Sequence, residues 1–267
     1  ISGAVVSAAH FMMDKEAFMV CDNAGILSKS DKSKVFDKDA DGSVLGEGVV
    51  SIYVEPLSSA INKKKHIYAV IKGSACNNDG YSMGIMAPNA DGQFDVLKKA
   101  YQDAGVSPND ISYLEAHGTG TRIGDPIEFR SLVKLFTEVG SENIGNETIG
   151  IGSIKSNMGH LLSAASGAGI VKLLECFERK TLVPSINMNN INPALNIRKT
   201  PFYVVTEAEE WKVADGKKRC AAITSLGIGR TNSHFILQEY DERPSAPQYD
   251  LYPIIISAKT GDALERR

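Results

Sequence analysis

Short β-branched runs alternate with helical patterns through the middle of this 267-residue chain. The spacing of apolar residues predicts strands at residues 111–115 and 149–154, and helices at residues 91–104, 126–139 and 161–179. Alternation of this kind is typical of an α/β fold in which helices cover a mixed sheet. Chemically active side chains in such sheets gather in the loops beyond the strand ends. The sequence therefore directs attention to the segments that follow residues 115 and 154.

The flanking parts of the chain predict further strands and two shorter helices. Strands are expected at residues 3–9, 48–55, 67–75, 202–205, 221–226 and 234–239, and helices at residues 14–21 and 57–65. Residues 241–247 have the composition of a linker. A new strand is expected at residues 251–256, followed by a helix over residues 260–267. This last segment resembles the beginning of another unit.

Composition excludes several classes of protein. The net charge of −3 gives no electrostatic reason to expect nucleic acid or an anionic membrane as a partner. No apolar stretch reaches the roughly 18 residues that a membrane span requires. Cys21, Cys76, Cys176 and Cys220 are scattered rather than paired, which favours reduced thiols in a cytoplasmic protein over a zinc site.

Two histidines lie where predicted strands give way to turns of small residues. His117 follows Glu115 and precedes Gly-Thr-Gly-Thr, and His160 lies five residues beyond Lys155. Neutral imidazoles can donate hydrogen bonds to an enolate oxygen while a carbon–carbon bond forms. The alternative interpretation is structural: a tight turn at His117 and a capping histidine at His160.

The position of His160 predicts its charge. It falls at the first turn of the helix expected over residues 161–179, where the helix dipole disfavours an imidazolium ion. Lys155, expected in the same pocket, acts in the same direction. A neutral His160 that serves as a hydrogen-bond donor follows from both effects.

Two further motifs carry weaker signals. The run Ser225-Leu-Gly-Ile-Gly-Arg-Thr-Asn232 ends a strand in alternating glycines, which suits an oxyanion hole or a tight β-turn. The run Asp37-Lys-Asp-Ala-Asp-Gly42 superficially resembles a calcium loop, but it lacks the later bidentate glutamate. A turn whose aspartates bond to their own backbone is favoured there, and no metal site is expected.

Taken in order, these segments resemble the β-ketoacyl synthase family, specifically the ketosynthase domains of modular polyketide synthases. The matching stretches are residues 35–48, 77–80, 87–89, 115–128, 152–160 and 225–234. The resemblance extends to about residue 239. It implies a thiolase-like layered αβαβα fold, of which this chain would be a C-terminal part.

The resemblance also implies an activity: decarboxylative Claisen condensation of an acyl thioester with malonyl-acyl carrier protein. No bound cofactor is implied, because the substrates are carried on phosphopantetheine. By position, His117 and His160 would stabilise the enolate with support from Lys155. Thr119 and Thr121 would face the pantetheine, and the backbone N–H of Ile228 would complete the oxyanion hole. The implied partners are acyl carrier protein, neighbouring megasynthase domains and a second copy in a homodimer.

The chain departs from the family pattern in its nucleophile. The family's cysteine lies in a Thr-Ala-Cys elbow, and none of the four cysteines here has that setting. We therefore expect a cysteine-bearing segment outside this sequence; the alternative is a protein that truly lacks that half. Residues 1–75 would then complete the N-terminal half, residues 76–240 would form the C-terminal half, and residues 241–267 would be the linker and the start of the next unit.

A second departure concerns substrate preference. Arg230 replaces a customary glycine, and Ile228 replaces a customary phenylalanine. The Arg230 side chain would alter the acyl tunnel or pair with a carboxylate. Retention of both histidines favours an elongating enzyme over the alternative, a gatekeeper or scaffold that transfers acyl chains without extending them.

Overall fold

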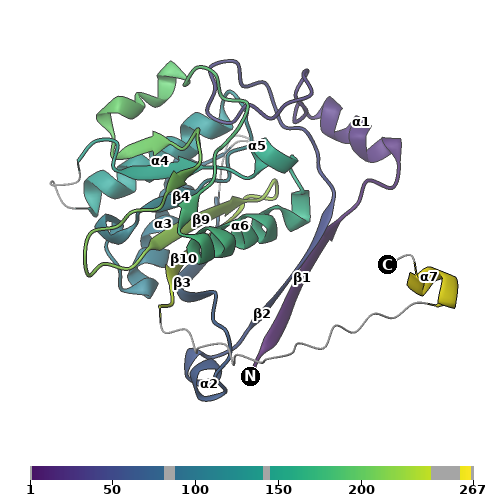
Figure 1. Ribbon diagram of the computed structural model, residues 1–267. Helices are drawn as coiled ribbons and strands as arrows, with labels where there is room; N and C mark the ends of the chain where they lie inside the picture. Colours follow the sequence, from purple (N-terminus) through teal and green to yellow (C-terminus); the bar gives the residue numbers. More distant parts are fainter. Residues whose placement is uncertain (1, 81–87, 141–144, 242–258, 266–267) are drawn as a thin grey trace.

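The main body of the molecule is built on a six-stranded mixed sheet (Figure 1). The computed structural model describes residues 2–80, 88–140, 145–241 and 259–265. The strands, in spatial order, are β3 (Ala69–Asn78), β10 (Thr231–Glu239), β9 (Cys220–Leu226), β4 (Tyr113–Glu115), β5 (Ile149–Gly152) and β7 (Phe202–Val204). β4 is parallel to both β5 and β9, whereas β10 is antiparallel to both of its neighbours.

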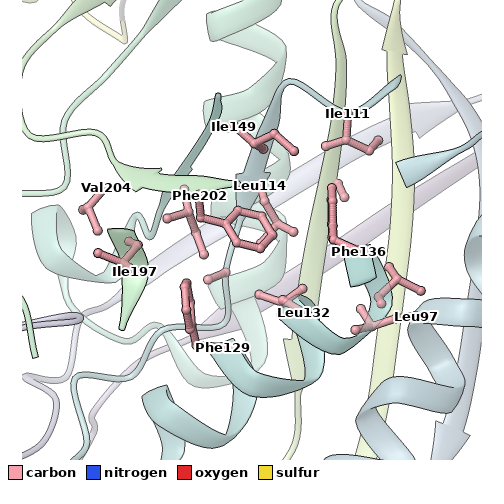
Figure 2. Close-up of a cluster of buried hydrophobic side chains, with 14 of the residues drawn as sticks. Leu97, Ile111, Leu114, Phe129, Leu132, Phe136, Ile149, Ile197, Phe202 and Val204 are labelled. Atoms are coloured by element: carbon pink, nitrogen blue, oxygen red, sulfur yellow. The ribbon is translucent and has the colours of Figure 1, made fainter. Parts of the chain in front are cut away.

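Helices cover both faces of this sheet. α3 (Ala90–Ala104) and α4 (Gly124–Glu138) pack on one face, and α6 (Ala165–Arg179) packs on the other. Successive residues of β4 point to opposite faces, so Leu114 joins the α3–α4 core while Tyr113 joins the α6 core. Figure 2 shows the first of these cores, in which Phe129 and Phe136 of α4 lie beside Phe202 of β7.

A separate two-stranded sheet forms a further layer. β1 (Ala4–His10) pairs antiparallel with β2 (Gly48–Val54). Val50 of β2 packs against the alanine-rich start of α6, where a Cβ on Gly167 would lie only 3.0 Å from the valine. The order of layers is therefore α3–α4, large sheet, α6 and β1–β2, which confirms the predicted α/β class and its layered arrangement.

The outer face of the β1–β2 sheet exposes apolar side chains on either side of a hydrogen-bonded pair, Ser7 and Ser51. Cross-strand register places Val5 opposite Tyr53, and Val49 lies on the same face. Their exposed fractions are 69%, 52% and 59%, respectively. Apolar surface gathered in this way marks a region suited to contact with other protein.

The remaining elements are short. They are α1 (Lys15–Asn23), α2 (Leu57–Asn62), α5 (Lys155–Met158), α7 (Gly261–Glu265), the β6 (Thr181–Leu182) and β8 (Glu209–Glu210) pair, and 3-10 turns at Pro108–Asp110, Leu162–Ala164, Pro193–Leu195 and Ile197–Lys199. Within the described ranges, no helix combines the length and apolarity needed to cross a membrane. The strand predicted at residues 251–256 and residues 242–247 of the predicted linker lie outside the described residues.

Two predicted helix starts are wrong. α6 begins at Ala165 rather than residue 161, because Leu162 adopts a left-handed φ of +40° and a 3-10 turn intervenes. α4 begins at Gly124, two residues before the predicted start at residue 126. β3 crosses the predicted division between residues 75 and 76, and that division remains a prediction.

Candidate active site

Three parallel strands deliver the candidate residues to one edge of the sheet. His117 lies two residues beyond β4, and Lys155 lies three residues beyond β5. Leu226 ends β9, on the other side of β4. Because carboxyl ends of neighbouring parallel strands meet at one edge, the segments that follow them lie together.

Several hydrogen bonds hold His117 in place. Its Nδ1 accepts the backbone N–H of Leu226 at 3.3 Å. The carboxylate of Glu128 accepts the backbone N–H groups of His117 and Gly118 at 2.7 and 2.9 Å. Gly118 has a φ of +44°, and a Cβ there would lie 2.8 Å from side-chain atoms of Ser153 and Val35. Glycine is therefore required for this turn.

His160 reaches the same site from a different segment. Its side chain is buried, and its backbone N–H donates to the carbonyl of Val44 at 2.7 Å. Its Nδ1 accepts the backbone N–H of Leu162 at 3.1 Å. The ring centroids of His117 and His160 are 5.5 Å apart, with the planes inclined at 81°.

These contacts assign the proton in each ring. A neutral imidazole has one donor and one acceptor nitrogen, and Nδ1 is the acceptor in both His117 and His160. The proton therefore lies on Nε2 in each ring. The site presents two imidazole N–H donors of the same kind.

Burial is the main reason that both histidines are neutral. Burial lowers the pKa of His160 to about 3, and the charge of Lys155 acts in the same direction. Burial, Lys155 and His160 together hold the pKa of His117 well below its usual value. The predicted neutrality of His160 is confirmed, but the helix-dipole explanation is wrong because α6 starts five residues later.

Lys155 is buried next to the backbone of His117. It is 4% exposed, and its Nζ donates to the carbonyl oxygen of His117 at 2.5 Å. Burial lowers its pKa, whereas the carboxylates of Glu115, Glu128 and Asp125 favour its ammonium form. The predicted grouping of His117, Lys155 and His160 is thus found in the structure.

The two threonines belong to the turn that follows His117. The hydroxyls of Thr119 and Thr121 are 3.1 Å apart, and the Thr121 hydroxyl also accepts the N–H of Gly124 at 3.1 Å. Asp125 accepts the N–H of Gly120 at 3.0 Å. This carboxylate holds the turn that carries both threonines in place.

Ile228 lies in the tight turn between β9 and β10. The turn is closed by the N–H of Gly227, which donates to Thr231 at 2.7 Å, and Ile228 is 52% exposed. Arg230 has a left-handed φ of +67°, and its Nη1 donates to the carbonyl of Gly80 at 2.9 Å. Within the described part of the chain Arg230 forms no ion pair with a carboxylate. The hydrogen bond from Leu226 to His117 attaches this turn to the site.

Two of the aspartates in residues 37–42, Asp37 and Asp41, accept hydrogen bonds. Asp37 accepts the backbone N–H groups of Asp39, Asn189 and Asn190 at 2.6 to 2.8 Å. The favoured self-bonded turn is therefore confirmed at Asp37. Over the described ranges, no cluster of three or more histidine, cysteine or acidic residues has the arrangement of a metal site.

The four cysteines are free thiols placed away from one another along the chain. Cys176 of α6 and Cys220 of β9 are buried, and burial raises the pKa of both, to about 12 for Cys220. A raised pKa lowers the thiolate fraction and makes these two thiols poor nucleophiles. Cys21 lies on α1 and the exposed Cys76 lies on β3.

Sequence reasoning missed two buried carboxylates. Burial raises the pKa of Asp125 to about 6 and that of Glu128 to about 7, although both accept backbone N–H groups. The two residues are three positions apart and share one face of α4. That spacing, directly after the turn at His117, is the signal that could have identified them.

Family models match two parts of the chain. The model of the β-ketoacyl synthase N-terminal domain matches residues 1–60, and the model of the C-terminal domain matches residues 68–189. Polyketide synthase PksN of Bacillus subtilis is 42% identical over 233 residues, which are 84% of this chain and 4% of that protein. PksM of the same organism is 40% identical over 271 residues, covering 99% of this chain and 6% of that protein.

Solved ketosynthases have the same fold. The ketosynthase from module 6 of the bacillaene synthase of Bacillus subtilis is 40% identical, with a TM-score of 0.87 over 90% of this chain and 43% of that chain. The oxazolomycin ketosynthase domain of Streptomyces albus is 32% identical, with a TM-score of 0.90 over 99% of this chain and 46% of that chain. The chain thus spans under half the length of these ketosynthases, and it belongs to the β-ketoacyl synthase family, as a thiolase-like ketosynthase of the polyketide synthase type.

Proposed function

We propose that this chain supplies the decarboxylation and condensation groups of an elongating ketosynthase. The single observation that carries the proposal is the pair of neutral imidazoles, 5.5 Å apart between ring centroids, whose Nδ1 atoms are both occupied by backbone N–H groups. Two Nε2–H donors are what a malonyl thioester needs as its carbonyl oxygen becomes an enolate oxygen. The substrate is malonyl-acyl carrier protein, held by its phosphopantetheine.

The reaction follows from these donors. His117 and His160 hydrogen-bond to the thioester oxygen of the malonyl group. The bond to the carboxylate carbon breaks, carbon dioxide leaves, and the electron pair forms an enolate that both donors stabilise. The enolate carbon then attacks an acyl thioester on a cysteine, and the thiolate departs as the carbon–carbon bond forms.

Lys155 has a supporting role in this scheme. Its ammonium group donates to the carbonyl of His117 and so fixes the position of that residue. Its positive charge also lowers the pKa of both histidines, which keeps their rings uncharged. Thr119 and Thr121 would contact the pantetheine, and the N–H of Ile228 would stabilise the oxyanion of the acyl thioester.

We infer that the nucleophilic cysteine lies on a ketosynthase segment outside these 267 residues. The apolar face of the β1–β2 sheet, on which Val5, Val49 and Tyr53 are exposed, is suited to pack against such a segment. The greater length of the solved ketosynthases supports the same inference. A homodimer in the cytoplasm, served by an acyl carrier protein and neighbouring synthase domains, completes the proposal.

Malonyl decarboxylation by the whole ketosynthase tests this function. His117→Ala and His160→Ala should each slow carbon dioxide release by about 100-fold to 1,000-fold, the scale of one oxyanion donor. His66→Ala is the control, because His66 is a surface residue paired with Glu178. Undiminished release from the His160 variant would refute its role.

Product mass separates the two candidate activities. Acyl chains that grow by one two-carbon unit are expected of the elongating enzyme. Acyl chains that are transferred without growth, even when malonyl-carrier protein is present, would identify the gatekeeper instead.

A further inference from the structure

A buried ion pair lies directly behind the two-histidine site. Glu115 ends β4, two residues before His117, and Lys172 lies on α6. The Nζ atom of Lys172 is 2.8 Å from Oε2 of Glu115, and the two side chains are only 4% and 2% exposed. The hydroxyl of Tyr113 lies 2.7 Å from the same Nζ and 3.1 Å from the same Oε2. The charges are therefore paired and hydrogen-bonded out of contact with water.

The second carboxylate oxygen of Glu115 reaches the start of α5, the helix that begins with Lys155. Oε1 accepts the backbone N–H of Ile154 at 2.6 Å. The next residue is Lys155, whose Nζ donates to the carbonyl of His117. One carboxylate thus connects the end of β4, the start of α5 and, through Lys172, α6.

Stability alone gives little reason for a charged pair at this place. The pair adjoins an apolar cluster that includes Leu173 and Cys176. Desolvation of two charges cancels most of their attraction, so well-packed apolar side chains of similar volume often stabilise a protein as well or better. The Glu115–Lys172 pair instead fixes the relative positions of two elements, because the one carboxylate accepts hydrogen bonds from both of them.

The pair also contributes to the field at Lys155. Burial lowers the pKa of Lys155; Glu115 of β4, with Glu128 and Asp125 of α4, raises it, and Lys172 of α6 lowers it. The nearby imidazoles of His117 and His160 are neutral. Removal of Glu115 should therefore lower the pKa of Lys155, and removal of Lys172 should raise it.

We propose that Glu115 is a positioning residue of the active site: its carboxylate, neutralised by Lys172, fixes the start of α5, which carries Lys155, against the end of β4, which His117 follows. It touches no substrate and acts through Lys155 and His117. This inference rests on the proposed function, since it concerns the same decarboxylation.

The test uses the complete ketosynthase with malonyl-carrier protein. Glu115→Gln keeps the size of the side chain and an acceptor for Ile154 but removes the charge. We expect kcat for carbon dioxide release to fall roughly 10-fold to 100-fold. KM should stay unchanged, and the alkaline limb of the rate–pH profile should move to lower pH because Lys155 loses its proton more readily.

A double variant separates geometry from charge. Glu115→Gln with Lys172→Met removes one charge of each sign near Lys155. The alkaline limb should return towards its wild-type position, whereas kcat should remain low because the charged acceptor is still absent. This variant leaves no unpaired buried charge, so it also decides the question if Glu115→Gln alone does not fold.

A matched control is the other largely buried pair, Arg219 and Glu239, whose side chains are 13% and 6% exposed. Glu239→Gln should lower the thermal midpoint and leave the pH profile unchanged. Wild-type kcat and an unmoved profile in Glu115→Gln, or wild-type kcat in the double variant, would overturn the proposal. Absence of decarboxylation in the wild type and in Glu239→Gln alike would instead overturn the proposed function on which it rests.

Discussion

The ring of His160 accepts a hydrogen bond from the backbone of Leu162, two residues further along the chain, at 3.1 Å. Leu162 itself has a φ of +40°, a left-handed value that leucine rarely adopts, so the chain changes direction directly after this N–H. The cost of that conformation is of the order of 1–3 kcal/mol. That cost is offset by the surrounding packing. The hydrogen bond to Nδ1 fixes which nitrogen of His160 carries the proton.

Both active-site histidines should therefore be Nε2–H tautomers. Nδ1 is an acceptor in His117 and in His160, and the lowered pKa of each ring keeps it neutral at pH 7. Long-range ¹H–¹⁵N spectra of selectively labelled protein report the tautomer directly. A protonated Nδ1 in either ring at pH 7 would contradict the assignment.

Glu128→Gln should destabilise the protein by about 1–3 kcal/mol, the cost of leaving a buried donor unpaired. Both carboxylate oxygens accept backbone N–H groups, from His117 and Gly118. A glutamine offers only one oxygen, so its NH₂ group must face one of those donors. Urea unfolding followed by the fluorescence of Trp211, the single buried tryptophan, measures the change.

Glu138→Gln is the matched control for that experiment. Glu138 is an exposed residue at the end of the same helix, α4, and its replacement should change the free energy of unfolding by less than about 0.5 kcal/mol. Equal effects from the two substitutions would mean that the Glu128 contacts contribute nothing specific.

Acid should destabilise the fold through His234. This residue is completely buried on β10, its Nδ1 lies 3.0 Å from the hydroxyl of Thr224, and burial lowers its pKa to about 3. Below the unfolded value of about 6.5 the unfolded chain binds a proton that the folded chain does not. Stability is therefore fully present above pH 6.5 and is lost as the pH falls towards 3, at about 1.4 kcal/mol per pH unit.

Measurement of the free energy of unfolding at pH 7 and at pH 5 isolates the contribution of His234. Between pH 7 and pH 5 the free energy of unfolding of the wild-type protein should fall by about 2 kcal/mol more than that of His234→Gln. His66→Gln, at a surface histidine, should behave as the wild type does. Equal losses in His234→Gln and wild type, measured from urea unfolding midpoints, would show that His234 is not the responsible group.

Strand–helix alternation was sufficient to predict the α/β class, and the resemblance carried by the motifs predicted its layers and the grouping of His117, Lys155 and His160. They did not predict where α6 begins, because the apolar pattern continues from Leu161 into the helix and nothing local signals a left-handed leucine. The sequence patterns also did not predict the partners of Glu115. Lys172 is 57 residues away in sequence, and only the packing of α6 on β4 brings the two charges together.

The alternation of side chains along β4 has a consequence for how this strand can change during evolution. Tyr113 and Glu115 face α6, whereas Leu114 faces α3 and α4. Insertion or deletion of a single residue between Glu115 and His117 would rotate the histidine out of register with its carboxylate support. Natural variants of this strand should therefore differ by substitution and keep a constant length.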